Sequence, residues 1–402
     1  MGSDRNGSRT GLVEKKAGVN QQRLVDLFIE LVKIDSPSGK EKRIADRVQE
    51  KLRRLGLEVS MDDAGSAFGG EAGNVFGVLR AKDRGRSGRP AGSARPARTP
   101  ILCAHMDTVR PAPGLEPRIE DGVIHSDGRN ILAADDKAGV AAILEALSVL
   151  HETGRPHGDL RVLFTVGEEI GLFGARGVSQ DELEGGLAFV FDSGSEVGTI
   201  IVDTPTEIDL TIRVIGKTAH AGVEPEKGVN AIHVAAKAMA TLPTGRLDPE
   251  TTLNFGVIHG GTATNIVPED VTIEMETRSR NRTALDRLVR EVEEAFRGKA
   301  AAAGATVDIK KEEAYQGFRL SEKDDVVRVA MGAIRRLGLE PRLSPRGGGS
   351  DANILNMRGV PAVNLGAGYD DDHTSRERIP IKQLVLAAEL ALAIIDGFAT
   401  GG

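Results

Sequence analysis

Apolar and polar positions along the first half of the chain predict helices and strands in turn. Residues 21–34 and the stretch after Glu41 have apolar residues at three- and four-residue spacing, which indicates amphipathic helices. Ser38 and Glu41 match a capping box at the start of the second helix. Further strands and one helix are predicted at 57–62, 74–81, 99–109, 135–154 (the helix), 160–169 and 187–194. Strands that alternate with helices indicate an α/β domain with a mostly parallel sheet and helices on both faces.

The pattern changes near residue 206. Residues 207–216 alternate between apolar and polar side chains, which is typical of a half-exposed strand. A helix, two strands, a helix and a strand follow at 228–242, 253–260, 270–278, 283–304 and 306–314. This βαββαβ order predicts a compact two-layer module inserted into the chain. We therefore predict a mobile tail at 1–19, an α/β domain formed by 20–205 and 318–402, and an inserted module at 206–317.

The composition argues against a membrane protein and a nucleic-acid-binding protein. The chain has 402 residues, of which 40% are hydrophobic and 28% charged, as in soluble globular proteins. No apolar run reaches the roughly 18 residues of a membrane span, and a net charge of −7 argues against nucleic-acid binding. The one basic stretch, 80–98, is rich in Gly, Pro and Ser, and we interpret it as a solvated, disordered loop. A single cysteine, Cys103, excludes an intramolecular disulfide and fits a reducing cytoplasm.

Histidine and carboxylate residues lie at or just after the carboxyl ends of the predicted strands. They are His105, Asp107, Glu168, Glu169, Asp192 and His373, and Asp135 and Asp136 begin a helix. A single acidic residue at such a position is most often a helix cap. Several such positions together are a stronger signal, because ligands of open α/β sheets collect at the carboxyl ends of the strands. Glu168 and Glu169 repel each other, so this pair in particular predicts a nearby positive charge.

These side chains form a nitrogen and oxygen donor set suited to Zn²⁺, Mn²⁺ or Co²⁺. A catalytic zinc usually takes three protein ligands, and this set is larger. It suffices for two metal ions about 3.5 Å apart that share one carboxylate. One glutamate of the adjacent pair would then bind a cation, and the other would be available as a general base.

Eight short motifs occur in one order along the chain: HMDTV, ADDKAG, GEEIGLFGARG, DSG, KTAHAG, GGTATNIVPE, GGSDAN and DDHT. Over roughly residues 20–398 the sequence resembles the peptidase T and aminoacylase family of dinuclear zinc metallopeptidases, most closely its peptidase T-like branch. The resemblance implies that His105, Asp135 and Asp192 bind one zinc ion. It also implies that Asp135 bridges to a second zinc ion held by Glu169 and His373.

The resemblance implies further roles close to the metal ions. Asp107 would orient the imidazole of His105. Glu168 would take a proton from the attacking water and pass it to the leaving amine. A cis peptide is expected between Asp135 and Asp136. The segment ILAADD has alanines where many relatives have glycine, which predicts a changed backbone fit and unchanged metal ligation.

In the inserted module, the resemblance implies a lid. His220 would stabilise the oxyanion at the scissile carbonyl, Asn265 would reach the substrate, and Arg278 would meet a substrate carboxylate. Relatives often pair through this module, and in some the lid histidine enters the partner's active site. The resemblance therefore makes a homodimer through this module one possibility, and it leaves open whether His220 acts in its own chain or across such a dimer. The Gly-rich stretch 346–353 lacks the ending of a phosphate loop and is interpreted as a tight turn on the substrate side.

The sequence thus predicts a cytoplasmic zinc-dependent exopeptidase, an aminopeptidase acting on short peptides such as tripeptides, with hydroxide generated by Glu168. An amidohydrolase or carboxypeptidase of the same fold, acting on N-acyl amino acids or other small amides, is the alternative. A non-catalytic binding protein is the third hypothesis. We favour catalysis because Glu168 and all five implied metal ligands are present.

Overall fold

The computed structural model describes residues 18–81 and 98–399. Residues 1–17, most of the tail that we expect to be mobile, lie outside this range, as do residues 82–97 of the basic stretch. Within the described part, no helix is both long and apolar enough to cross a membrane.

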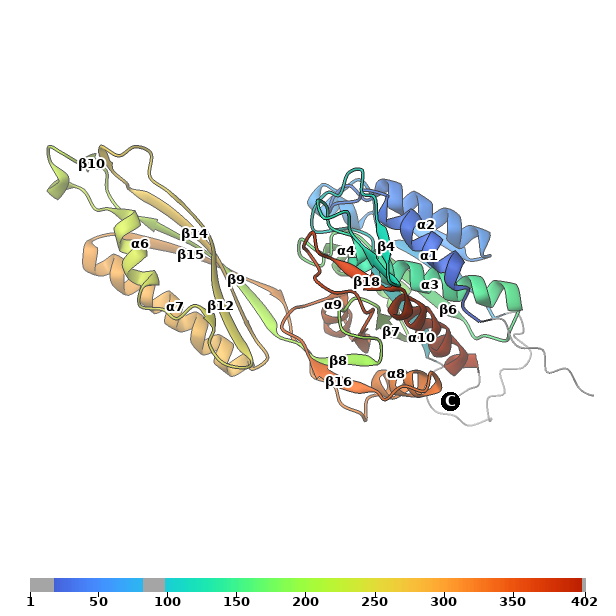
Figure 1. Cartoon of the computed structure of the whole chain (residues 1–402). Helices are drawn as coiled ribbons and strands as arrows, with labels where there is room; N and C mark the ends of the chain where they lie inside the picture. Colours follow the sequence, from blue (N-terminus) through green and yellow to red (C-terminus); the bar gives the residue numbers. More distant parts are fainter. Residues whose placement is uncertain (1–17, 82–97, 400–402) are drawn as a thin grey trace, which may run out of the picture.

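An eight-stranded sheet forms the centre of the α/β domain (Figure 1), in the order β1-β2-β6-β3-β7-β17-β8-β16. The central run β6-β3-β7-β17 is parallel, and β16 is parallel to β8. These strands are β1 (Glu58–Met61), β2 (Val75–Leu79), β3 (Thr99–His105), β6 (Leu160–Thr165), β7 (Gly186–Val190), β8 (Thr199–Asp203), β16 (Arg342–Pro345) and β17 (Ala362–Leu365). A small sheet beside it contains β4 (Arg118–Glu120), β5 (Val123–His125) and β18 (Arg378–Pro380).

Helices cover both faces of the large sheet, as the sequence predicted. Because side chains alternate along a strand, Leu102 and Ala104 of β3 enter one core, whereas Ile101 and Cys103 enter another. The larger core includes residues of α1, α2, α3, α8 and α10, and the smaller includes residues of α5 and α9. The helices are α1 (Gln21–Val32), α2 (Lys42–Arg54), η1 (Ala64–Phe68), α3 (Ala134–Thr153), α4 (Phe173–Gly177), α5 (Gln180–Leu183), α8 (Asp325–Arg336), α9 (Asp351–Met357) and α10 (Ile381–Ala399).

Residues 206–315 form a second sheet with two helices on one face, in the predicted βαββαβ order. Its strand order is β11-β12-β14-β9-β15, and a two-stranded ribbon, β10-β13, is separate. The elements are β9 (Thr206–Ile215), β10 (Ala219–His220), η3 (Pro225–Lys227), α6 (Ala231–Met239), β11 (Gly245–Arg246), β12 (Thr251–Gly260), β13 (Ile266–Val267), β14 (Asp270–Ser279), α7 (Arg282–Ala303) and β15 (Thr306–Tyr315). Burial alternates along β9, as its sequence pattern predicted.

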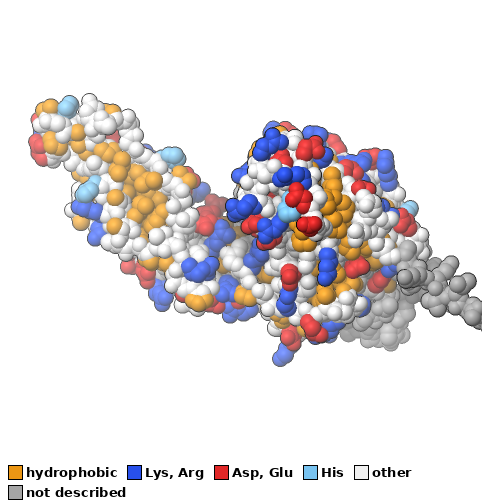
Figure 2. Space-filling view, viewed as in Figure 1, with side chains coloured by type: hydrophobic (Ala, Val, Ile, Leu, Met, Phe, Trp, Pro, Cys, Tyr) orange, Lys and Arg blue, Asp and Glu red, His pale blue; other side chains and the backbone are white. Residues whose placement is uncertain are grey.

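The inserted module extends away from the α/β domain, with β10 at its far end (Figure 1). Hydrophobic side chains gather along its visible surface (Figure 2). Five large apolar residues of the module are exposed around β12 and the ribbon: Val223, Ile232, Val257, Ile258 and Ile266. β11 pairs only with Thr252 and Leu253, so among the described residues the rest of β12 forms a free sheet edge.

The capping box predicted at Ser38 and Glu41 is wrong. Glu41 precedes α2, but its side chain makes no capping hydrogen bond. The Ser38 hydroxyl instead donates to the carboxylate of Asp107 at 2.6 Å. The buried Glu41 carboxylate accepts a hydrogen bond from the N–H of Gly167 at 3.0 Å. Both side chains therefore support the turn that follows β6 rather than the start of the helix.

Candidate metal centre

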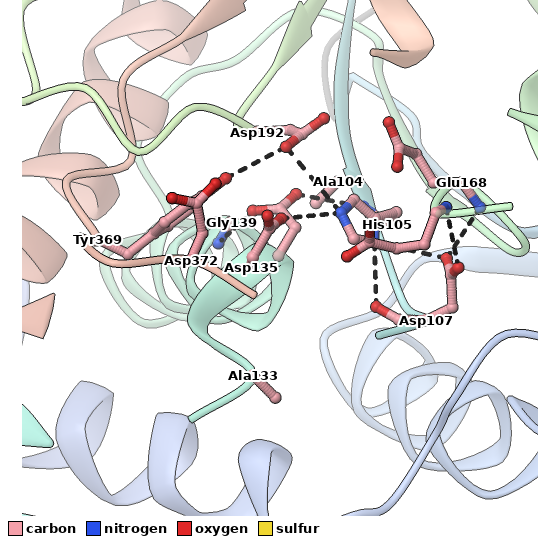
Figure 3. A network of polar contacts seen from close by, with 12 residues as sticks. Ala104, His105, Asp107, Ala133, Asp135, Gly139, Glu168, Asp192, Tyr369 and Asp372 are labelled. Carbon is pink, nitrogen blue, oxygen red and sulfur yellow. Dashed lines mark hydrogen bonds and ion pairs between the residues drawn. The ribbon is translucent and has the colours of Figure 1, made fainter. Parts of the chain in front are cut away.

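Two histidines approach the two oxygens of one aspartate at the carboxyl ends of the parallel strands. Figure 3 shows one of them, His105, beside Asp135. His105, the last residue of β3, has its Nε2 atom 3.0 Å from Oδ1 of Asp135. His373, in the loop between β17 and β18, has its Nε2 atom 3.3 Å from Oδ2 of the same residue. Asp135 lies at the start of α3, so its carboxylate stands between the two imidazoles.

Each histidine also meets a second carboxylate. Oδ1 of Asp192, which follows β7, lies 4.0 Å from Nε2 of His105. Oε2 of Glu169, which follows β6, lies 3.1 Å from Nε2 of His373. The five residues implied as metal ligands are thus brought together by the fold. Two groups of side chains in this space have the spacing to hold a metal ion: His105 with Asp135 and Asp192, and Asp135 with Asp372 and His373.

The carboxylate of Asp107 lies behind His105 and holds the turn at Glu168 and Glu169. It accepts the backbone N–H groups of Glu168 at 3.0 Å and Glu169 at 3.2 Å, besides the hydroxyl of Ser38. The His105 Nδ1 atom lies 3.0 Å from the Asp107 carbonyl oxygen and 3.4 Å from its carboxylate. This arrangement leaves Nε2 of His105 directed at Asp135 and fixes the two adjacent glutamates by their main chain.

The backbone around Asp135 is unusual. The peptide between Asp135 and Asp136 is cis, as expected, and Ala133 has a φ of 63°. That φ lies in the left-handed region, which costs a residue with a Cβ roughly 1–2 kcal/mol. The Asp136 carboxylate accepts the N–H groups of His105 and Gly139, each at 3.2 Å, and so joins β3 to the start of α3.

The buried site concentrates negative charge. Burial raises the pKa of the Glu168 carboxyl well above its ordinary value, and the nearby Asp192 raises it further. Burial also raises the pKa of Asp192 and of Glu169. Hydrogen bonds to Asp135 and Glu169 raise the pKa of His373 to about 10. Several carboxyl groups are therefore buried close together, and their mutual repulsion favours a bound cation between them.

Three residues near the site were missed by the sequence analysis. Asp372 offers an oxygen to the second group of donors, and Tyr369 donates its hydroxyl to Oδ1 of Asp192 at 3.2 Å. Glu377 is buried and accepts two backbone N–H groups next to Asp135. The position of Asp372 directly before His373 was a usable signal. Nothing in the local sequence singles out Tyr369 or Glu377.

The structure does not bring His220 and Asn265 to this site. They lie together at the ribbon, where the N–H of Ala221 donates to the carbonyl of Asn265 at 2.9 Å. The ribbon is at the far end of the inserted module from the α/β domain (Figure 1). His220 is exposed, and its Nδ1 accepts the N–H of Gly222 at 3.2 Å, which makes Nε2 the donor nitrogen of the neutral ring.

Arg278 lies where the inserted module meets the α/β domain. It lines a cavity of about 170 Å³ together with three further arginines, Arg246, Arg280 and Arg346. Its guanidinium is 2.7 Å from Glu276 and 3.1 Å from Glu207. Arg346 belongs to the Gly-rich stretch that we interpreted as a turn on the substrate side, and it donates to the hydroxyl of Ser193, next to Asp192, at 2.9 Å. Glu250 is the one carboxylate among the lining residues, so the lining is cationic on balance, and Arg346 connects the cavity to the strand end that presents Asp192.

Comparison with known proteins identifies the class. Residues 101–397 match peptidase family M20/M25/M40. The crystal structure of aminopeptidase PepT from Bacillus cereus is 43% identical, with a TM-score of 0.83 over 95% of this chain and 99% of that chain. A tripeptidase structure from Staphylococcus aureus is 39% identical, with a TM-score of 0.87 over 96% of this chain and 100% of that chain. Peptidase T of Escherichia fergusonii is 30% identical over 71% of this chain and 70% of that protein.

The chain belongs to peptidase family M20/M25/M40 and is a hydrolase that acts on peptide bonds. Within that family it is a peptidase T-like member, which confirms the resemblance found in the sequence. The mixed α/β fold, with its large sheet and helices on both faces, matches these solved structures over nearly the whole chain.

Proposed function

We propose that this protein is a zinc-dependent aminopeptidase that removes the first residue from short peptides, tripeptides above all. The main observation in support is the Asp135 carboxylate, which offers one oxygen to each of two histidines. The similarity to an aminopeptidase PepT and to a tripeptidase, at 43% and 39% identity, supports the substrate class.

The side chains present fit two divalent cations. His105, Asp135 and Asp192 would hold one ion, and Asp135, Glu169 and His373 the other. Nitrogen and carboxylate oxygen donors in this number suit zinc. The Oε1 atom of Glu169 is buried and has no hydrogen-bond partner among the described residues, a cost that a bound cation would remove. When bound, the two ions would polarise the scissile carbonyl and make water more acidic.

Glu168 is the residue that we propose to move the proton. Its main chain is fixed by the hydrogen bond to Asp107, so the side chain is anchored beside the ligand set. Burial raises the pKa of its carboxyl, and a base with a raised pKa both accepts a proton from water and holds it until the amine leaves. Asp107 would fix the orientation of the His105 ring and the positions of Glu168 and Glu169.

The cationic cavity would receive the far end of the substrate. A carboxylate is the group that Arg278 and its neighbours would bind best, since guanidinium groups donate two parallel hydrogen bonds to it. Glu207 and Glu276 already meet part of the charge of Arg278, so they would hold its guanidinium in place. A carboxylate bound at a fixed distance from the metal site would favour peptides of one length.

Tripeptides with free or acetylated amino termini test the proposal. Each is offered to the chelator-stripped protein and to the protein reloaded with Zn²⁺, and mass spectrometry identifies the products. We expect release of the first residue, from free amino termini only and only after reloading. Cleavage of acetylated peptides, or release of the last residue, would instead assign an amidohydrolase or a carboxypeptidase of this family.

We further propose that the inserted module joins two copies of the chain. Among the described residues, no strand pairs with the outer edge of β12 beyond Leu253, and exposed Val257 and Ile258 lie on that edge. Such an edge pairs readily with another strand unless something covers it. A second copy that presents the same edge, related by a two-fold axis, would satisfy both edges at once and bury the apolar residues around them.

Replacing Ile258 with aspartate tests this interface. Ile258 is 50% exposed, so the monomer should fold normally, whereas in the dimer the new carboxylate would be buried at the interface at a cost. We expect light scattering to give twice the chain mass for the unmodified protein and the chain mass for Ile258→Asp. Asp308→Ala, on β15 at the opposite edge of the same sheet, serves as the control and should stay dimeric. An unmodified protein of single-chain mass at micromolar concentration would contradict the proposal.

A further inference from the structure

Glu377 lies between the two loops that present the shared carboxylate and the second histidine. It follows His373 by four residues and is only 1% exposed. The loop that contains His373 and Glu377 is bound to Ser126, which follows β5 of the small sheet. The N–H of Ser126 donates to the Glu377 carbonyl at 3.2 Å, and the hydroxyl of Ser126 donates to the Ser375 carbonyl at 2.6 Å. The backbone that carries the Glu377 side chain is therefore fixed by hydrogen bonds to Ser126.

Both oxygens of this carboxylate accept backbone hydrogen bonds from the segment before α3. Oε2 accepts the N–H of Ala133 at 2.8 Å, and Oε1 accepts the N–H of Asp135 at 3.0 Å. Each of these bonds satisfies a backbone N–H of a buried segment. They connect residues more than 240 positions apart in the chain.

The segment that Glu377 holds is one that would not keep its shape unaided. Ala133 adopts the left-handed conformation with a φ of 63°, which is unfavourable for alanine. If these two N–H groups lost their acceptor, the segment would be free to relax, and the carboxylate of Asp135 would move with it. His373 also has a positive φ, of 61°, in the loop that ends at Glu377.

We infer that Glu377 is a positioning residue, which sets the Asp135 carboxylate in the gap between His105 and His373. This inference rests on the proposed role of Asp135 as the bridging ligand. Glu377 does not touch the donor atoms themselves. It acts through hydrogen bonds to the backbone. These bonds join the segment that carries Asp135 to the loop that carries His373, and so keep the two side chains at a fixed separation.

Glu377→Gln tests the inference through zinc affinity. The amide has nearly the same shape, but its NH₂ group would face a backbone N–H instead of accepting from it. We expect the affinity for Zn²⁺, measured by titration against a chromophoric chelator, to fall about 10- to 100-fold, as is typical when a group that supports a metal ligand is removed. On a tripeptide at saturating Zn²⁺, kcat should fall and KM should stay within about twofold, because substrate contacts are unchanged.

Glu145→Gln is the matched control. Glu145 is also fully buried and also accepts a backbone N–H, from Asn20 at 2.8 Å, but it lies well along α3 from Asp135. It should lower the melting temperature and leave zinc affinity within about twofold. Equal losses of zinc affinity in the two variants would reduce the effect to general destabilisation and overturn the inference. Unchanged zinc affinity in Glu377→Gln would overturn it too.

Two further outcomes are distinguishable. If Glu377→Gln does not fold, Glu377→Asp keeps the carboxyl group but is one methylene too short to reach both N–H groups, and its zinc affinity should still fall by about 10-fold. Unchanged affinity in that variant would overturn the inference. If the unmodified protein itself binds no Zn²⁺, the proposed function fails, and the positioning role fails with it.

Discussion

Glu168→Gln is expected to lower kcat on a tripeptide by about 10²- to 10⁴-fold, the usual contribution of a general acid–base residue. Glutamine fills the same space but cannot accept the proton of the attacking water. The turn should persist, because Asp107 holds it through the backbone N–H groups of residues 168 and 169. Zinc content, measured by mass spectrometry of the metal, should therefore stay at that of the unmodified protein.

Glu152→Gln is the control for this substitution. Glu152 is a half-exposed carboxylate near the end of α3, and it follows Asp135 by 17 residues, which is about 25 Å along a helix. Its kcat should match that of the unmodified protein. If Glu168→Gln retained more than about a tenth of the activity, well above the level that loss of a general base leaves, another group would have to move the proton.

His220→Ala is expected to lower kcat/KM by about 10²- to 10³-fold, as removal of an oxyanion donor does. The structure presents Nε2 of His220 as a donor at the end of the inserted module, far from the metal site of the same chain. We therefore propose that His220 serves the site of a second copy. The loss should fall mainly on kcat, since the contact strengthens in the transition state.

Mixing two inactive variants shows whether His220 acts in the site of its own chain or in that of a second copy. In a dimer of one Glu168→Gln chain and one His220→Ala chain, one site would have Glu168 from the second chain and His220 from the first. Random exchange would then restore up to about a quarter of the unmodified activity, since half the dimers are mixed and each has one complete site. No recovery would mean that His220 acts within its own chain. Adding Ile258→Asp to both chains should abolish recovery.

The sequence by itself determined the elements and their order. Apolar spacing predicted the strands and helices of the α/β domain, and period-two alternation predicted β9, whose residues alternate in burial. The order βαββαβ was sufficient to predict a separate two-layer module. Such patterns are informative because helix and strand geometry fix, over a few residues, which side chains share a face. The strand-end rule gathered eight histidines and carboxylates. The family resemblance singled out five of them, which the fold does bring together: His105, Asp135, Glu169, Asp192 and His373.

Contacts between distant parts of the chain were not predictable in this way. Ser38 and Glu41 have the spacing of a capping box, yet Asp107 and Gly167 engage them instead. Glu377 has no local signal, because its two hydrogen bonds depend on where a loop returns more than 240 residues later. The distance of His220 from its own metal site likewise depends on how the inserted module is joined to the α/β domain.

What the sequence determined was therefore the chemistry available at the site and the elements that present it. Only the tertiary structure decided which carboxylates support the ligands and which side chains stay outside the site. The reason is physical: side-chain periodicity follows from short-range backbone geometry, whereas the partner of a buried polar group is whichever donor or acceptor the folded loops bring within hydrogen-bond distance.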